Sequence, residues 1–349
     1  MHDYAGSIHF HSAYSYDARV PLVDIVKDAA AANLRFAIVT DHFRMDARQD
    51  HLDGYHGNLL LIVGEEISPR YNHYLALGIE KPVVVWKSET NAQRMIDEVN
   101  AQGGFGFISH PDHAGAPLFG SRAYPWIRWD VQGYAGLGIW DLMSDWNASL
   151  ETPWSTLKAC LRPAHVLQGP TLKTLARWDK LTQKNHCVAI GEIDNHAHQR
   201  SFFGFSRDIF PFAFAFRTIR THVLLENALS HDAKADERLI LAALKQGQSY
   251  VSLDLWNDPA GFSFTIYDEN HKAWPGGEFT RQGQAILEAK LPGAGKLLLI
   301  RDGRVVKEEA RRTAMQWDVD LPGVYRVEAQ QYVSGRWRPW IYSNPIWVK

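Results

Sequence analysis

The sequence is poor in cysteine, in long apolar runs and in excess charge. Cys160 and Cys187 are the two cysteines among 349 residues. They cannot form the disulfide framework of a small secreted protein, so we expect a protein of the reducing cytoplasm. No apolar run reaches about 18 residues, which argues against a membrane-spanning helix. With 37 basic and 39 acidic residues the net charge is −2, so general binding to nucleic acid is not expected.

Histidine, in contrast, is frequent. The chain has 16 histidines, and nine of them precede residue 120. Imidazole is the commonest side-chain metal ligand, so this enrichment indicates metal binding. Apolar residues make up 46% and charged residues 22%, an ordinary composition for a globular chain whose length allows two domains.

Short apolar runs alternate with helix-like segments up to about residue 258. The runs cover 7–10, 36–40, 59–63, 74–79, 105–108, 137–140 and 188–190, and the helix-like segments 21–30, 90–102, 171–183 and 236–246. Such alternation predicts a mostly parallel sheet. No glycine-rich dinucleotide turn follows the first run, which favours a closed or nearly closed α/β barrel over a doubly wound sheet.

After Asp258 the pattern changes to short alternating runs. Residues 262–266 alternate between apolar and polar, and Asp302-Gly303 between two apolar runs signals a hairpin. The last 90 or so residues therefore predict a small antiparallel β-sandwich of immunoglobulin-like type. We place the domains at 1–258 and 259–349.

Ionisable residues follow the predicted strands one after another. His9 and His11 share one strand face, since side chains two residues apart point the same way. The further groups are Asp17, Asp41 with His42, Glu65 with Glu66, His73, His110 with Asp112 and His113, and Asp194 with His196. In α/β barrels the carboxyl ends of the strands build the active site. Clustered ionisable groups are costly unless paired or metal-bound, so the set predicts a metal centre.

In this order the motifs resemble those of the polymerase and histidinol phosphatase (PHP) superfamily of metallohydrolases. They are His-Phe-His-Ser at 9–12, Thr-Asp-His at 40–42, Gly-Glu-Glu-Ile-Ser at 64–68, His-Tyr-Leu at 73–75, Ser-His-Pro at 109–111 and Asp-Asn-His at 194–196. The resemblance covers roughly residues 5–200. It implies a distorted seven-stranded (β/α)7 barrel that holds up to three metal ions.

The resemblance also implies a ligand set for each ion. The first ion would take His9, His11, Glu66 and Asp194, the second Glu66, His73 and His110, and the third Asp17, His42 and His196. Glu66 rather than Glu65 would bridge two ions. Asp41 would orient His42.

The C-terminal part carries a second resemblance. Residues 340–346, Trp-Ile-Tyr-Ser-Asn-Pro-Ile, after Tyr-Arg-Val-Glu-Ala at 325–329 are similar to the branch that joins a PHP barrel to a sandwich. Carbaryl-hydrolase-like metallohydrolases belong to that branch. The likeness implies hydrolysis of carbamates or carboxylic esters as an alternative to phosphoesters.

A centre of imidazoles and carboxylates without thiolate suits two or three divalent ions of zinc, iron or manganese. We expect a metal-bridging hydroxide to attack the phosphorus of a small phosphorylated metabolite or nucleotide. Asp112 or His113 would protonate the leaving oxygen. Arg19 would clamp the phosphate through its guanidinium fork, and an ordinary surface role is the alternative for this residue.

Three hypotheses follow. A phosphoesterase is favoured. The second is a carbamate, amide or carboxylic ester hydrolase with the same metal centre. The phenylalanine-rich stretch 202–216 supports this hypothesis, because it could form an apolar wall around the substrate. A packed loop or an interface explains that stretch as well. The third is a non-enzymatic metal-binding module, which the full ligand set disfavours. The net charge of −2 disfavours a proofreading exonuclease. We expect the partner to be a small-molecule substrate and expect no membrane association. The 13 tryptophans leave self-association open.

Overall fold

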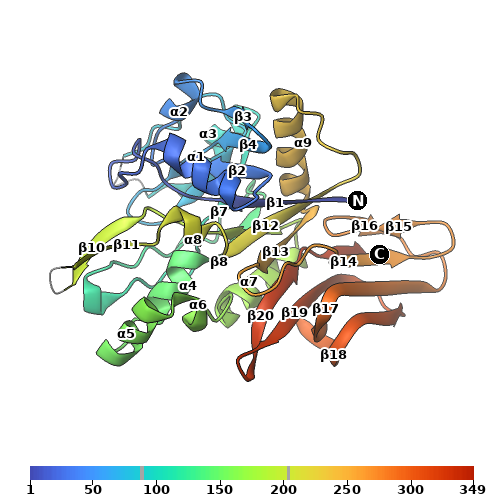
Figure 1. Ribbon diagram of the computed structural model, residues 1–349. Coiled ribbons are helices and arrows are strands. Elements are labelled where there is room, and N and C mark those ends of the chain that lie inside the picture. Colours follow the sequence, from blue (N-terminus) through green and yellow to red (C-terminus); the bar gives the residue numbers. More distant parts are fainter. Residues whose placement is uncertain (87–89, 203–204) are drawn as a thin grey trace.

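The computed structural model describes residues 1–86, 90–202 and 205–349 and has a mixed α/β architecture (Figure 1). A five-stranded sheet lies beside a 14-stranded one. The smaller sheet contains β5 (Glu65–Ile67), β6 (Tyr74–Leu77), β7 (Phe105–Ile108), β8 (Gly136–Asp141) and β9 (Val188–Glu192). The N-terminal strands of the larger sheet are β1 (His2–Ile8), β2 (Phe36–Val39), β3 (Gly54–His56), β4 (Leu59–Val63), β12 (Ile219–Leu225) and β13 (Ser249–Leu253).

Parallel pairing covers only part of these sheets. β1–β2–β4 and β7–β8–β9 are parallel, as the alternating pattern predicts. β6 runs antiparallel to both of its neighbours, and β12 runs antiparallel to β1 and β13. The sheets are therefore mixed, because short connections such as the one between β5 and β6 return the chain directly.

The two sheets meet at two seams through isolated bridges, His42 with Glu66 and Phe10 with Asn195, rather than through a regular ladder. At one seam β4 continues through Gly64 into β5, and a Cβ on Gly64 would lie 2.7 Å from Leu77 Cδ2. At the other, the Ile193 amide donates to the Ile8 carbonyl at 3.2 Å. Among the described residues the strands form no continuous closed ladder, so the predicted seven-stranded barrel is not confirmed.

The backbone explains why the ladder stops at the second seam. His9, directly after β1, has φ 68°, and Asp194, just after β9, has φ 43°. Such left-handed conformations turn the chain out of the extended form that a ladder needs. They cost non-glycine residues on the order of 1–3 kcal/mol and cluster at functional sites.

Helices lie where the apolar periodicity predicts them. They are α1 (Leu22–Ala31), α3 (Ala92–Ala101), α7 (Leu172–Thr182) and α9 (Ala233–Gln246). Gly247 ends α9 at φ 77°, and the N-terminal cap is Asp232, whose side chain accepts the Ala235 amide. The shorter helices are α2 (Asp46–Gln49), η1 (Pro117–Phe119), α4 (Leu142–Ala148), α5 (Pro153–Leu161), α6 (Pro163–Val166) and α8 (Phe212–Ala215).

None of the helices in the described part of the chain is long and apolar enough to cross a membrane.

The C-terminal strands continue the larger sheet (Figure 1). They are β14 (Ser263–Tyr267), β15 (Lys272–Ala273), β16 (Glu278–Phe279), β17 (Ala285–Arg301), β18 (Arg304–Val319), β19 (Gly323–Val333), β20 (Arg336–Ser343) and β21 (Ile346–Val348). All their pairings are antiparallel except β16–β21. Asp302 and Gly303, both with positive φ, make the predicted hairpin between β17 and β18. The ladder from β13 to β20 crosses the predicted boundary at 258, and the division into two domains stays a prediction.

His222 on β12 is held between two carboxylates at this junction. Its Nδ1 lies 2.8 Å from Asp3 Oδ1 and its Nε2 3.1 Å from Asp254 Oδ2. Burial lowers the pKa of His222, but Asp254 and Asp3 outweigh burial and raise that pKa to about 9. The protonated imidazole therefore stabilises the fold.

We expect His222→Gln to lower the free energy of unfolding most at about pH 6. A raised folded-state pKa contributes stability fully below the unfolded value of about 6.5 and loses it as the pH rises through about 9. Urea unfolding of both proteins from about pH 6 to pH 10 measures this. A mutant deficit that stays constant across that range would contradict the ion-pair account.

Candidate metal centre

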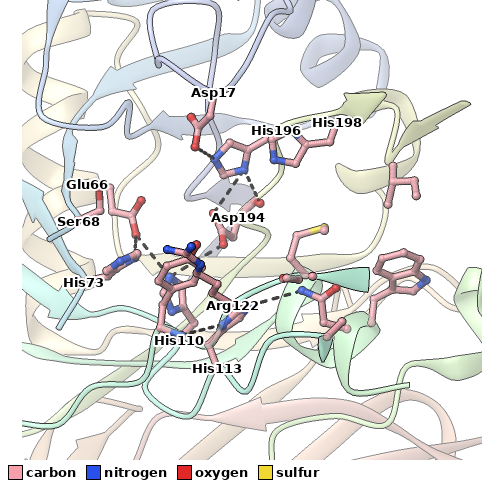
Figure 2. Close-up of a pocket in the computed structure, with 18 of the residues that line it drawn as sticks. Asp17, Glu66, Ser68, His73, His110, His113, Arg122, Asp194, His196 and His198 are labelled. Atoms are coloured by element: carbon pink, nitrogen blue, oxygen red, sulfur yellow. Dashed lines mark hydrogen bonds and ion pairs between the residues drawn. The ribbon is translucent and has the colours of Figure 1, made fainter. Parts of the chain in front are cut away.

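The nine residues proposed as metal ligands come together in one place. Figure 2 shows six of them, Asp17, Glu66, His73, His110, Asp194 and His196. The nine residues arrive from separate strand ends: His9 follows β1, His42 follows β2, and Glu66 lies in β5. His11 and Asp17 lie in the loop after β1, and His73 directly precedes β6. His110 follows β7, and Asp194 and His196 follow β9. Strand ends that meet at one edge of the sheets thus gather side chains that are up to about 190 residues apart in sequence.

Four of them form the tightest group. The side-chain N and O atoms of His9, His11, Glu66 and Asp194 lie within 4.8 Å of one another. Asp194 Oδ1 is 3.3 Å from His9 Nε2 and 3.2 Å from His11 Nε2. His9 Nε2, His11 Nε2 and Glu66 Oε2 are buried and make ion-pair contacts but no well-aligned hydrogen bond among the described residues, and Glu66 Oε2 lies 2.8 Å from His42 Nδ1. Buried polar atoms normally have partners, so this donor set fits a cation.

Glu66 joins this group to a second one. Its other oxygen, Oε1, lies 2.8 Å from His73 Nδ1 and 3.4 Å from His110 Nε2. Burial favours the neutral acid, but His73, His9 and His42 hold the pKa of Glu66 well below its usual range. An ionised carboxylate with one oxygen toward each group has the geometry to bridge two ions.

A third group contains His11, His42 and His196. Asp17 adjoins it, with Oδ2 at 3.3 Å from His42 Nε2 and 3.6 Å from His196 Nε2. Burial, His196 and His42 lower the pKa of His11, so its ring is neutral, the form that binds metal.

Glu65 and Glu66 are separated by strand geometry. Successive side chains on β5 point to opposite faces. Glu65 is buried away from the histidines and accepts the Val83 amide at 2.8 Å through Oε2. Burial raises the pKa of Glu65 to about 8. The structure therefore places Glu66, and not Glu65, in the cluster.

Hydroxyl groups orient two of the imidazoles. Ser68 Oγ lies 2.7 Å from His42 Nδ1. Ser68 thus orients the His42 ring, a role that the sequence suggested for Asp41. Asp41 instead accepts Ser12 Oγ and Ser15 Oγ, both at 2.8 Å, and Ser15 Oγ lies 3.2 Å from His11 Nδ1. Asp41 thus acts on His11 through Ser15 and not on the His42 side chain.

Glu192 is a supporting residue that the residue patterns did not single out, although it lies between the apolar run 188–190 and Asp194. Its Oε1 lies 3.1 Å from His9 Nδ1 and accepts Ser109 Oγ at 2.7 Å, and its Oε2 accepts the His110 amide at 2.9 Å. A carboxylate on the far nitrogen of a metal-binding histidine fixes its tautomer and orientation.

Replacing Glu192 with Gln is expected to weaken metal binding by about 10- to 100-fold while the fold persists. Gly138→Ala provides an independent route to the same result, because a Cβ there would overlap Glu192 Oε2. Metal titration of both variants followed by calorimetry measures the effect. Unchanged affinity in both would show that Glu192 only fills space.

The three residues proposed for catalysis are placed differently. His113 lines the cavity of about 800 Å³ beside the metal ligands. Asp112 is held toward α7 by Thr174 Oγ1 at 2.8 Å and by Lys173 Nζ at 2.5 Å, and it is not part of that lining. Arg19 is exposed outside the lining, where it pairs with Asp208.

Arg70, Arg122, Tyr16 and Tyr124 also line the cavity, and the sequence analysis did not identify them. They lie in irregular loops, where no periodicity indicates the direction of a side chain. Arg122 makes no ion pair or hydrogen bond with another residue in the described ranges. Tyr16 stacks on His42 with ring centroids 5.1 Å apart, so it covers one ligand.

The phenylalanine-rich stretch is packed in its described C-terminal part. Phe212 and Phe216 are buried against Phe10, with ring centroids 6.0 and 5.3 Å apart. Ile209 lines the cavity. Residues 203–204 lie outside the described ranges.

Comparisons with known proteins give distant likenesses in structure. No family model matches the sequence, and no curated protein matches it. A two-domain protein from Bacteroides vulgatus, described as containing a predicted PHP-like metal-dependent phosphoesterase, is 15% identical over 99% of this chain and 95% of its own, with a TM-score of 0.41. An amidohydrolase from Chromobacterium violaceum with bound sulfate and no metal is 12% identical over 59% of this chain and 92% of its own, with a TM-score of 0.32. At TM-scores this low, neither likeness assigns a function.

Proposed function

We propose that the protein is a metal-dependent hydrolase of the PHP superfamily that cleaves a phosphoester of a small molecule. The observation that carries this proposal is the convergence of three ligand groups, in which Glu66 and His11 each belong to two. A purely structural role does not account for so many buried ligand atoms that face one another without a well-aligned hydrogen bond among the described residues. The ordered motifs from His9 to His196 support the superfamily.

The centre is proposed to hold two or three divalent ions of zinc, iron or manganese. Its donors are imidazole nitrogens and carboxylate oxygens, without thiolate. Bound there, such ions would supply Lewis-acid polarisation of the ester and activation of a water molecule. Asp194 and Glu66, both ionised, provide the negative charge that balances them.

Arg122 supplies positive charge for an anionic substrate. It is exposed within the cavity lining and has no partner among the described residues. Its guanidinium fork can donate two parallel hydrogen bonds to a phosphate. Arg122 therefore takes the role that the sequence suggested for Arg19, and it favours a phosphoester over a neutral ester.

His113 is the proposed hydrogen-bond donor to the leaving oxygen. Burial and His110 lower the pKa of His113 to about 3, so its ring is neutral. Its Nδ1 accepts the Tyr124 amide at 3.3 Å, which leaves the proton on Nε2 and requires the Asn147 side-chain amide, 3.5 Å away, to turn its oxygen toward Nε2. This neutral donor stabilises the developing negative charge on the leaving oxygen.

A carbamate or carboxylic ester hydrolase is the second candidate. The observation that favours it is the apolar lining of the cavity by α4, including Met143 and Leu150, which suits an acyl or aryl group. With either function we propose an immunoglobulin-like sandwich at 259–349, a cytoplasmic location and a small-molecule substrate as the partner.

Elemental analysis of the purified protein, followed by turnover of 4-nitrophenyl phosphate and 4-nitrophenyl acetate, tests the proposal. We expect two or three equivalents of metal and release of phosphate. Turnover of the acetate alone would favour the second candidate. A protein that takes up no metal after reconstitution would contradict both.

A further inference from the structure

The cavity beside the metal centre has a second, apolar end. Met143, Trp146, Asn147 and Leu150, on and just after α4, line it. Their spacing of three, four and seven residues places them on one face of a helix. α4 thus turns a single side toward the cavity.

This face begins close to the metal ligands. The rings of His110 and His113 have centroids 5.5 Å apart, and His113 Nε2 lies 3.5 Å from Asn147 Nδ2 (Figure 2). His110 belongs to a ligand group, so two short contacts join that group to α4. A substrate whose reacting end lies at the metal centre therefore reaches the α4 face with its next group.

The α4 face is built to hold hydrocarbon. The indole N–H of Trp146 already donates to the Ala159 carbonyl at 3.3 Å, so its ring offers no free donor to a ligand. Trp146 also packs edge-on against Phe210 with centroids 5.2 Å apart, which fixes its ring. Leu150 is 5% exposed and Met143 is half-buried.

Polar groups at this end are few. Among the lining residues of α4 and α5 they are the side chains of Asn147 and Thr156 and the weakly polar thiol of Cys160. A sugar would leave most of its hydroxyl groups without partners there, at a cost of about 1–3 kcal/mol for each unpaired group. A flat apolar ring loses nothing by desolvation and gains contact with Trp146 and Leu150.

We propose that the α4 face is the leaving-group subsite and that the substrate is the phosphate ester of an apolar, aromatic alcohol rather than a sugar phosphate or nucleotide. This inference rests on the proposed function for its phosphate end. In the reaction a water oxygen bonds to phosphorus and the bond from phosphorus to the aryl oxygen breaks. The leaving oxygen then takes one proton, which gives the free phenol and inorganic phosphate.

Binding of 2-naphthol to the protein without added metal tests the subsite apart from activity. We expect saturable binding measured by calorimetry, and a kcat/KM of the metal-loaded enzyme for 2-naphthyl phosphate about tenfold or more above that for glycerol 3-phosphate. Leu150→Asn, which removes apolar contact, and Met143→Trp, which fills the space, should each weaken naphthol binding about tenfold. Leu161→Asn on the outward side of α5, where Leu161 is 68% exposed, is the matched control and should change neither quantity.

The outcomes separate the two proposals. Naphthol binding that the α4 variants weaken, in a protein that takes up no metal, would support an apolar binding site at the α4 face and overturn both the hydrolase and the leaving-group role. Equal kcat/KM for the two phosphates, or naphthol binding that the α4 variants leave unchanged, would overturn the subsite while metal-dependent phosphate release still supports the hydrolase. Thermal melts show whether each variant is folded.

Discussion

Glu66→Gln is expected to abolish metal binding at two of the three ligand groups and to lower phosphate release by about a thousandfold. Glu66 contributes one oxygen to each of these groups and is the anion that His73, His9 and His42 stabilise. An amide keeps the shape of the side chain but loses its charge and one acceptor. Loss of several kcal/mol of metal-based stabilisation of the transition state corresponds to a rate change of this size.

Glu65→Gln is the matched control, one residue away on the other face of β5. An amide oxygen can still accept the Val83 amide, so metal content and turnover should persist. The folded-state pKa of Glu65, about 8, lies above its unfolded value of 4.5, so the fold loses stability progressively between these pH values and the loss is complete above about pH 8. Glu65→Gln should therefore be more stable than the wild type above that pH. Metal loss in the Glu65 variant and not in the Glu66 variant would reverse the assignment.

Asp179→Ala is expected to lower the free energy of unfolding by about 3 kcal/mol, toward the low end of the cost of breaking a buried ion pair. Asp179 on α7 receives two hydrogen bonds from Arg326 on β19, from Nε to Oδ1 at 2.6 Å and from Nη2 to Oδ2 at 2.9 Å. Truncation leaves the buried guanidinium with Glu328, which it contacts at 2.6 Å, and this remaining pair limits the loss. Urea unfolding at neutral pH measures the change.

The exposed pair of Arg94 and Glu98 on α3 is the reference for this effect. These side chains are 48% and 38% exposed and lie 2.7 Å apart at their charged ends. Glu98→Gln should cost about 0.3–0.5 kcal/mol, because water screens such pairs. Similar costs for Asp179→Ala and Glu98→Gln would show that the Asp179–Arg326 contact does not hold α7 to the C-terminal strands.

The sequence alone determined the local features of the chain. Apolar periodicity located α1, α3 and α7, and Asp302-Gly303 located the hairpin between β17 and β18. Ionisable residues directly after apolar runs identified the candidate ligands from His9 to His196. These inferences hold because the period of an element fixes where its side chains point, and because the ends of neighbouring strands lie at one edge of a sheet.

The tertiary structure alone decided which loops and helices complete the cavity. It brought Arg122 and the α4 face to the ligands, kept Arg19 and Asp112 out of the cavity lining, and set Glu192 behind His9. It also joined the two sheets beside His9 through an isolated bridge instead of a regular ladder. Each of these depends on how segments distant in sequence pack together, and the residues in irregular loops carry no periodic pattern that encodes such packing.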